Sequence, residues 1–138
     1  MTLSRIPRLL PVVLLGMTLC ACAEPCGNQL ILRVPSPDRV HDAVIYERDC
    51  GATTDFSTQV TLLRAGAELP HDPSPILVID SDHGRAVAGP GGGPLVEATW
   101  VSSDSLVVSF DEHARVFQHL SQFSNIGIRY VRSRRGGA

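Results

Sequence analysis

Residues that could do chemistry are concentrated in one segment, ERDCGATTDFSTQV, which runs from Glu47 to Val60. Cys50 could act as a nucleophile if a nearby base or cation held it as the thiolate. Arg48 supplies a positive charge and Asp49 a carboxylate, but no histidine motif of a cysteine-enzyme family accompanies them. A thiol-dependent enzyme that uses Cys50 is therefore an alternative interpretation of this segment and not the favoured one.

The favoured interpretation of the segment is structural. Cys50 pairs with Cys26 in a disulfide, Gly51 makes the turn, and the hydroxyl side chains satisfy nearby backbone groups. The same corner could also form a polar binding surface, because loops held by a rigid scaffold often carry function. The candidate binding residues are Arg48, Asp49, Thr53, Thr54, Ser57 and Gln59.

A second unusual segment is the glycine-rich stretch HGRAVAGPGGGP, residues 83–94. Glycine-rich loops hold phosphate when they join a strand to the start of a helix and are followed by Lys and then Ser or Thr. This stretch has no lysine, and no helix is predicted after it. We therefore predict a mobile connection between strands.

Metal-binding and catalytic patterns are missing from the sequence. No two of the five histidines stand at HxH or HxxxH spacing. The segment DSDHG (Asp80–Gly84) has its glycine one place early for a calcium loop and lacks the closing glutamate. Neither GxSxG nor a Ser/His/Asp pattern is readable. We predict no catalytic residue, no metal site and no cofactor.

The first residues, MTLSRIPRLLPVVLLGMTLCACAEP, have the layout of a bacterial export signal. Arg5 and Arg8 form a basic start, an apolar stretch from Leu9 to Leu19 follows, and small residues and cysteines end it. The apolar run is shorter than the ~20 residues of a membrane-spanning helix. We predict a signal peptide over residues 1–21.

Two cleavage sites fit this signal. LCAC resembles the lipobox of bacterial lipoproteins, which predicts cleavage before Cys22 and lipidation of that residue; cleavage after Ala23 by ordinary signal peptidase is the alternative. Both leave Cys26 and Cys50 as an even pair. We favour a lipid anchor in the membrane and predict an outer-membrane lipoprotein that faces the periplasm. A soluble periplasmic or secreted protein is the alternative.

The charge pattern argues against a nucleic-acid partner. All twelve basic residues are arginines, and ten of them follow the predicted signal together with all fourteen acidic residues, so the mature chain carries about −4. A mildly acidic chain with scattered arginines has no electrostatic footprint for nucleic acid. The short RSRR segment predicts a flexible basic tail over residues 132–138.

Short strands and turns make up most of the remaining sequence. QLILRV (29–34) alternates, with Leu30, Leu32 and Val34 on one face, and DAVIYE (42–47) completes a hairpin. VEATWV and SLVVSF form another, with one row of inward side chains on each strand. Further strands are FSTQVTLL, PILVID and NIGIRYV. We predict a mainly β fold: a small antiparallel β-sandwich or barrel-like domain of about seven short strands over residues 30–131, after a short tether at 22–29.

One segment has helical spacing. In DEHARVFQHLSQF, residues 111–123, the apolar residues Val116, Leu120 and Phe123 recur at the interval of a helix face. We predict a helical turn or two there.

Four motifs carry a resemblance to a protein family. CGN (Cys26–Asn28), SPD (Ser36–Asp38), AVIYERDCGATTDFSTQV (Ala43–Val60) and GPGGGP (Gly89–Pro94) resemble the pattern CGN, SPDG, AVVFxRDCGATTxFSTQV of small exported bacterial proteins. These proteins have no assigned activity, and many look like lipoproteins. The resemblance implies a Cys26–Cys50 disulfide and an envelope location, and it implies no reaction. Arg39 departs from the glycine usual in that family, so another type of first turn is expected.

Together these patterns predict an exported, lipid-anchored envelope protein that acts as a non-catalytic binding or interaction domain. Its partner, an envelope protein or a ligand, is not identified by the sequence. Two alternatives stay open: the thiol-dependent enzyme, and a purely structural component of the envelope.

Overall fold

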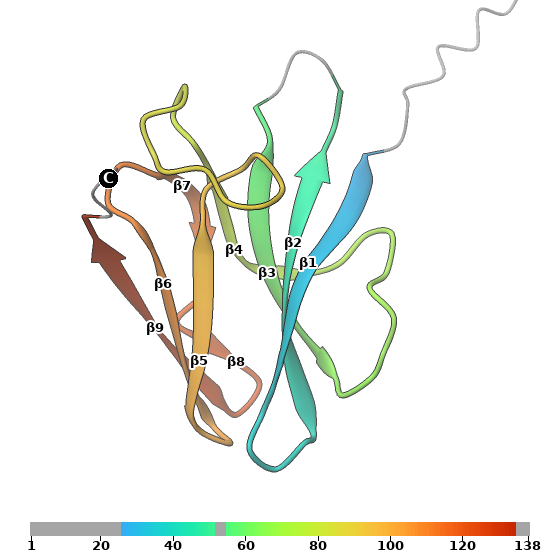
Figure 1. The fold of residues 1–138 in the computed structure, drawn as a ribbon. Helices are drawn as coiled ribbons and strands as arrows, with labels where there is room; N and C mark the ends of the chain where they lie inside the picture. Colours follow the sequence, from blue (N-terminus) through green and yellow to red (C-terminus); the bar gives the residue numbers. More distant parts are fainter. Residues whose placement is uncertain (1–25, 52–54, 135–138) are drawn as a thin grey trace, which may run out of the picture.

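Two β-sheets face each other (Figure 1) in the computed structural model, which describes residues 26–51 and 55–134. One sheet has the strand order β1–β2–β3–β4–β7 and the other β5–β6–β9–β8, and neither closes into a barrel. The prediction of a mainly β, sandwich-like fold is therefore confirmed. Within the described part of the chain the nine strands are β1 Gly27–Pro35, β2 His41–Asp49, β3 Ser57–Arg64, β4 Pro75–Asp80, β5 Val96–Ser102, β6 Ser105–Asp111, β7 Arg115–His119, β8 Gln122–Phe123 and β9 Ile126–Ser133.

The core lies between the sheets and is made of side chains that alternate along the strands. From the five-stranded sheet it takes residues such as Ile45, Val60 and Ile79, and from the other sheet Leu106 and Ile128. The predicted β5–β6 hairpin is confirmed. Its cross-strand pairs are Val96 with Phe110, Ala98 with Val108 and Trp100 with Leu106.

The predicted face of β1 was wrong because of a β-bulge. The strand register shifts between Leu30 and Leu32, so that Leu30 lies opposite Tyr46 and Leu32 lies opposite Ile45. Neighbouring residues of β2 point to opposite faces of the sheet, and the two leucines therefore do so as well. Both are about half exposed, whereas Ile31 and Val34 pack against the core.

The helical turns predicted within residues 111–123 are also wrong. Arg115–His119 forms the edge strand β7, which pairs antiparallel with β4. Val116 packs against the core and the next residue, Phe117, is exposed, as the alternation of a strand requires. Pairing with β4 satisfies backbone groups that a short isolated helix would leave open, since helices of this length are marginal alone.

The sequence predicted an antiparallel domain, but one strand pair is parallel. β6 and β9 run parallel, with Leu106 opposite Ile128 and Val108 opposite Tyr130. Between them the chain crosses to the other sheet to form β7 and returns through β8 (Figure 1). A parallel pair requires a long crossover connection, and β7 and β8 supply it.

A second buried layer covers the outer face of β2 and β3. The connection 65–74 folds over this face: Asn28 donates its side-chain amide to the carbonyls of Pro70 and His71, and Thr61 donates its hydroxyl to the carbonyl of Ser74. Val44 is fully buried beneath it. Burial on both faces explains why the apolar run in β2 is continuous and not alternating.

The described strands extend beyond the predicted domain limits of 30 and 131. β1 begins at Gly27, and β9 ends at Ser133. In the predicted basic tail the guanidinium of Arg132 lies over the Phe110 ring, and Arg134 donates to a carboxylate oxygen of Glu112 at 2.7 Å. The predicted signal peptide, both cleavage sites and Cys22 lie outside the described residues.

Candidate functional site

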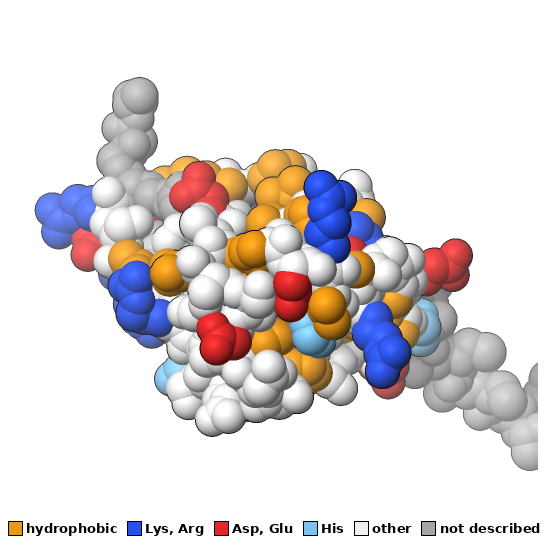
Figure 2. Space-filling view, turned by 90° about the horizontal axis from the view of Figure 1, so that it is seen from below, with side chains coloured by type: hydrophobic (Ala, Val, Ile, Leu, Met, Phe, Trp, Pro, Cys, Tyr) orange, Lys and Arg blue, Asp and Glu red, His pale blue; other side chains and the backbone are white. Residues whose placement is uncertain are grey.

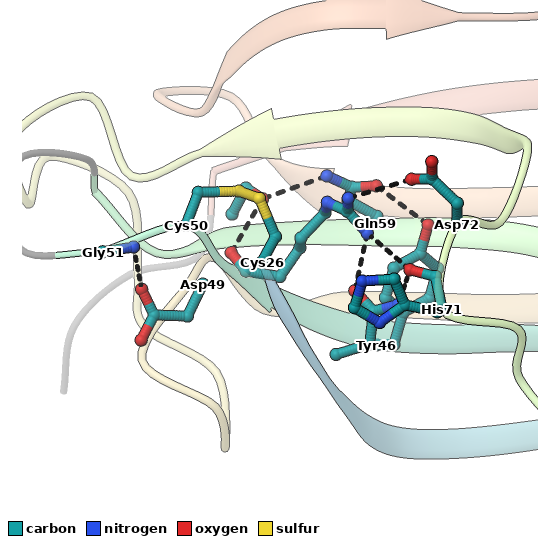
Figure 3. The surroundings of a disulfide bond; sticks show 11 residues. Cys26, Tyr46, Asp49, Cys50, Gly51, Gln59, His71 and Asp72 are labelled. Carbon is teal, nitrogen blue, oxygen red and sulfur yellow. Dashed lines mark hydrogen bonds and ion pairs between the residues drawn. A yellow bond between two sulfur atoms is a disulfide. The ribbon is translucent and has the colours of Figure 1, made fainter. Parts of the chain in front are cut away.

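The corner singled out in the sequence is joined by a disulfide between Cys26 and Cys50, which confirms the predicted pair (Figure 3). The bond ties the start of β1 to the end of β2, where Gly27 already pairs with Asp49 in the sheet. Backbone pairing brings the two Cα atoms to 4.1 Å, so the disulfide closes a corner that the hairpin has formed. In this state Cys50 has no thiol.

Next to the disulfide, four polar residues form one row across the five-stranded sheet. Arg48 of β2 lies opposite Ser57 of β3, Ser57 lies opposite Asp80 of β4, and Asp80 lies opposite Arg115 of β7. Side chains of directly paired residues project from the same face of a sheet. The adjacent row, which contains Ile79 and Val116, faces the core, so the polar row faces outward.

This row is the floor of an open cleft of about 400 Å³. Cys50 and Phe117 line it as well, and so do Asp55 and His83 from the loops before β3 and after β4. The volume lies at the lower end of the range of about 300–1,000 Å³ for small-molecule sites.

Asp80 and Arg115 form the strongest ion pair of the cleft. The Nε atom of Arg115 donates to Asp80 Oδ1 at 3.2 Å, and Nη2 donates to Oδ2, which makes the pair bidentate. Burial pushes the pKa of Asp80 up, but the hydrogen bonds from Arg115 and from the amide of Asp82 outweigh it and hold that pKa below the ordinary value. Asp80 is therefore a fixed anion, and it orients the Arg115 guanidinium.

Arg48 is held by hydrogen bonds as well, and Asp55 lies near a histidine. Arg48 donates to Asn28 Oδ1 at 2.9 Å, to the His71 carbonyl at 3.1 Å and to Asp72 Oδ1 at 3.0 Å. His83 Nδ1 lies 3.8 Å from Asp55 Oδ2. The Arg48 contacts reach into the connection that covers β2 and β3, so they also fasten that connection to the cleft.

The predicted binding residues divide into three groups. Arg48 and Ser57 lie in the cleft. Asp49 is exposed and turns back to accept a hydrogen bond from the Gly51 amide at 2.9 Å, on the other side of the disulfide from Gln59 (Figure 3). Thr53 and Thr54 lie outside the described residues.

Gln59 was predicted to be part of an exposed surface, and this is wrong. Its exposed fraction is 8%, its Oε1 accepts the hydroxyl of Tyr46 at 2.8 Å, and its Nε2 donates to Ser57 Oγ at 3.2 Å. Burial of Tyr46 raises the pKa of its phenol group. Gln59 therefore helps to hold the Ser57 hydroxyl in place at the cleft.

Several described residues that line the cleft were not predicted as site residues: Asp55, Asp80, His83, Arg115 and Phe117. The sequence places Asp80 at the end of a predicted strand and in a calcium-like loop, and it places Arg115 and Phe117 in a segment with helical spacing. The only signal in the sequence was spacing: Arg115 and Phe117 stand two residues apart on either side of Val116, so in a strand both project to the face opposite Val116.

The glycine-rich stretch predicted to be a mobile connection is packed onto the ends of β2 and β3. Thr58 donates its hydroxyl to the carbonyl of Pro94 at 2.7 Å, and the Gly89 amide donates to the Gly93 carbonyl at 2.7 Å. A Cβ on Gly93 would lie 2.5 Å from Thr58 Oγ1 and 3.0 Å from the Thr58 nitrogen. Glycine is required there by close approach.

A second hollow, of about 480 Å³, contains Ser81, Asp111 and His113 among its lining residues. Asp111 accepts hydrogen bonds from the backbone amide and Nδ1 of His113, at 2.8 and 2.9 Å. The backbone bond from His113 is the main reason why the pKa of Asp111 lies below its ordinary value. Ser81 Oγ accepts a hydrogen bond from the Gly84 amide at 3.2 Å. These contacts close two tight turns, and we assign them a structural role.

Residues 26–51 and 55–134 contain no group of three or more His, Cys, Asp or Glu residues that could hold a metal ion. Over the same ranges no helix is long and apolar enough to cross a membrane. Seen from below, at the end opposite the disulfide, charges of both signs are scattered without a patch of one sign (Figure 2).

Compared with protein-family models, with curated proteins and with solved structures, the chain gives no match. The class of the protein is therefore defined from its fold and its cleft alone. It is a mainly β, sandwich-like domain with a disulfide at one corner and a polar cleft beside that corner.

Proposed function

We propose that the protein is an exported, lipid-anchored envelope protein and that its β-sandwich is a non-catalytic binding domain. The observation that carries the proposal is the row Arg48, Ser57, Asp80 and Arg115, which lines a cleft beside the disulfide. Three adjacent strand pairs hold these residues, and preorganised polar groups in a concavity are the usual form of a binding site. The partner is an envelope protein or ligand.

Site-specific photocrosslinking tests the binding role. A photoreactive phenylalanine analogue at position 117 places the probe in the cleft, and the same probe at position 101 places it on β5 of the other sheet, where Val101 is also well exposed. We expect a discrete crosslinked product in intact cells from position 117 and none from position 101. Equal products from both positions, or none from either, would contradict the proposal and favour a purely structural component.

The enzyme alternative is tested by counting thiols. A nucleophilic Cys50 must be reduced, whereas the binding proposal keeps it bonded to Cys26. We expect no free thiol from these two cysteines when the exported protein is unfolded without reductant. Two free thiols, together with labelling of Cys50 in the folded protein, would favour the enzyme.

The anchor is tested separately, because it depends on Cys22 and not on the cleft. Palmitate labelling of growing cells should yield labelled protein in the membrane fraction, and Cys22→Ala should abolish the label. A single acyl chain binds a membrane only marginally, so several chains are expected on an anchored protein. Unlabelled protein found wholly in the soluble fraction would point to cleavage after Ala23.

A further inference from the structure

The charges that line the cleft cancel one another. Arg48 and Arg115 contribute two positive charges, and Asp55 and Asp80 contribute two negative charges. Each arginine holds a carboxylate at hydrogen-bond distance, Arg48 that of Asp72 and Arg115 that of Asp80. Both arginines of the cleft are therefore already neutralised, so among the described residues the cleft offers no free positive charge to attract an anion.

An anion that competed for the Nε and Nη2 groups of Arg115 would have to break an existing ion pair. Asp80 is only 4% exposed, and Arg115 holds both of its carboxylate oxygens. An anion that took Arg115 away would leave a buried carboxylate without its partner, which is strongly unfavourable. The cleft consequently disfavours phosphate or carboxylate groups at Arg115.

Hydrogen-bonding capacity nevertheless remains for a neutral ligand. Among the described residues Arg115 uses Nε and Nη2 for Asp80, and no hydrogen bond is made by its Nη1, while its side chain is 43% exposed. Asp55 is 41% exposed and has carboxylate oxygens that accept hydrogen bonds. A hydroxyl group both donates and accepts, so neighbouring hydroxyls can use both sites without a change of charge.

An apolar surface stands beside these polar groups. The Phe117 side chain is 60% exposed at the edge strand β7, and the Arg115 guanidinium lies 5.0 Å from its ring centroid. This cation–π contact holds the ring at the cleft. A large exposed aromatic ring next to convergent polar groups is typical of a binding site for a ligand with one apolar face.

We infer, on the basis of the proposed binding role, that the cleft binds a neutral sugar unit of an envelope glycan. A pyranose ring has a face of C–H groups that can pack on Phe117, and its rim carries hydroxyls that can reach Arg115 and Asp55. A neutral sugar fits a cleft whose arginines already hold carboxylates, and it leaves the buried Asp80–Arg115 pair intact.

An NMR titration of the isotope-labelled mature protein tests this inference. The probes are maltotriose, mannobiose and tri-N-acetylchitotriose, with inorganic phosphate as the anionic comparison. We expect saturable shifts of the Ser57 and Phe117 amides with at least one sugar and none with phosphate.

Two phenylalanine variants provide the matched comparison. Phe117→Ala should weaken sugar binding by about tenfold or more, in line with loss of a central aromatic contact. Phe56→Ala should change it by less than about twofold, because Phe56 is also exposed but does not line the cleft; its ring lies near Gly92. Thermal unfolding of both variants verifies that they are folded.

The outcomes separate the ligand class from the binding role. Cleft shifts with phosphate, no binding of any of the three sugars, or equal effects of the two variants would overturn the sugar inference. If position 117 still crosslinks in cells, the proposed binding domain stands with a different ligand. Failure of both the titration and the crosslinking would remove both proposals.

Discussion

The Oε2 atom of Glu47 lies directly against Gly91, where a Cβ would come within 2.4 Å of it. Glu47 is 6% exposed, and Oε2 has no hydrogen-bond partner among the described residues. Burial raises the pKa of Glu47, nearby Asp49 adds to the effect, and a hydrogen bond from the Gly93 amide opposes it. The glycine-rich loop and this carboxyl are therefore one packed unit whose stability depends on protonation.

Glu47→Gln should make the protein more stable at neutral pH. Because the folded-state pKa lies above the ordinary value of 4.5, the stability contribution of Glu47 is fully present below 4.5 and is lost as the pH rises through the folded pKa. The neutral amide removes this loss, and we expect a gain of about 1 kcal/mol at pH 7 and no gain at pH 4. Urea unfolding at both pH values measures it. Exposed Glu68→Gln is the control, and a gain that does not depend on pH would contradict the explanation.

Gly93→Ala should destabilise the protein by about 1–3 kcal/mol, since the new Cβ would overlap the Thr58 hydroxyl and approach the Thr58 backbone. Gly127→Ala is the matched control, because the nearest atom to a Cβ there is the Asp104 carbonyl oxygen at 3.8 Å. That control should stay within about 0.5 kcal/mol of the wild type. Chemical unfolding measures both. Equal effects of the two changes would show that the glycine-rich loop is not packed as described.

Asp111→Asn should destabilise the turn between β6 and β7 by about 1–3 kcal/mol at pH 7, because Asp111 is 1% exposed and accepts hydrogen bonds from His113. The folded-state pKa of Asp111 lies below the ordinary value of 3.8, so its contribution is present above 3.8 and is lost as the pH falls through the folded pKa. The difference between variant and wild type should therefore shrink in acid. Thermal unfolding between pH 7 and pH 2 follows it, with exposed Asp104→Asn as control. A difference that stays constant in acid would argue against this role of the carboxylate.

Replacing both Cys26 and Cys50 by Ala should lower the free energy of unfolding by about 2–4 kcal/mol, because the disulfide closes a loop with a sequence separation of 24. Reduction of the wild type should lower it by a similar amount, whereas reductant should leave the double variant unchanged. Urea unfolding with and without reductant measures both. A double variant as stable as the oxidised wild type would mean that the hairpin holds the corner without the bond.

Local sequence patterns were reliable where neighbouring segments pair with each other. The β5–β6 register follows from the alternation of Val96, Ala98 and Trp100 around a short turn. The cysteine pair could be predicted for a similar reason, since a hairpin brings Cys26 and Cys50 together.

The sequence was misleading where a distant contact decided the outcome. The bulge in β1 depends on how it pairs along β2, and no turn or proline marks it in QLILRV. Residues 111–123 have helical spacing, but β4 offers them an edge to pair with. Gln59 alternates as an outward residue, and the connection 65–74 then folds over that outer face, where Gln59 is buried against Tyr46.

The mainly β fold, the hairpins and the disulfide could be predicted from the sequence, because alternation, turn residues and an even cysteine pair act over short stretches of chain. The cleft could not be predicted in this way, because it depends on contacts between distant parts of the chain. Arg48, Ser57, Asp80 and Arg115 come from four strands, and the register between those strands sets which side chains share a row. A shift of one residue in any of these pairings would place side chains of the paired strands on opposite faces of the sheet and divide the row.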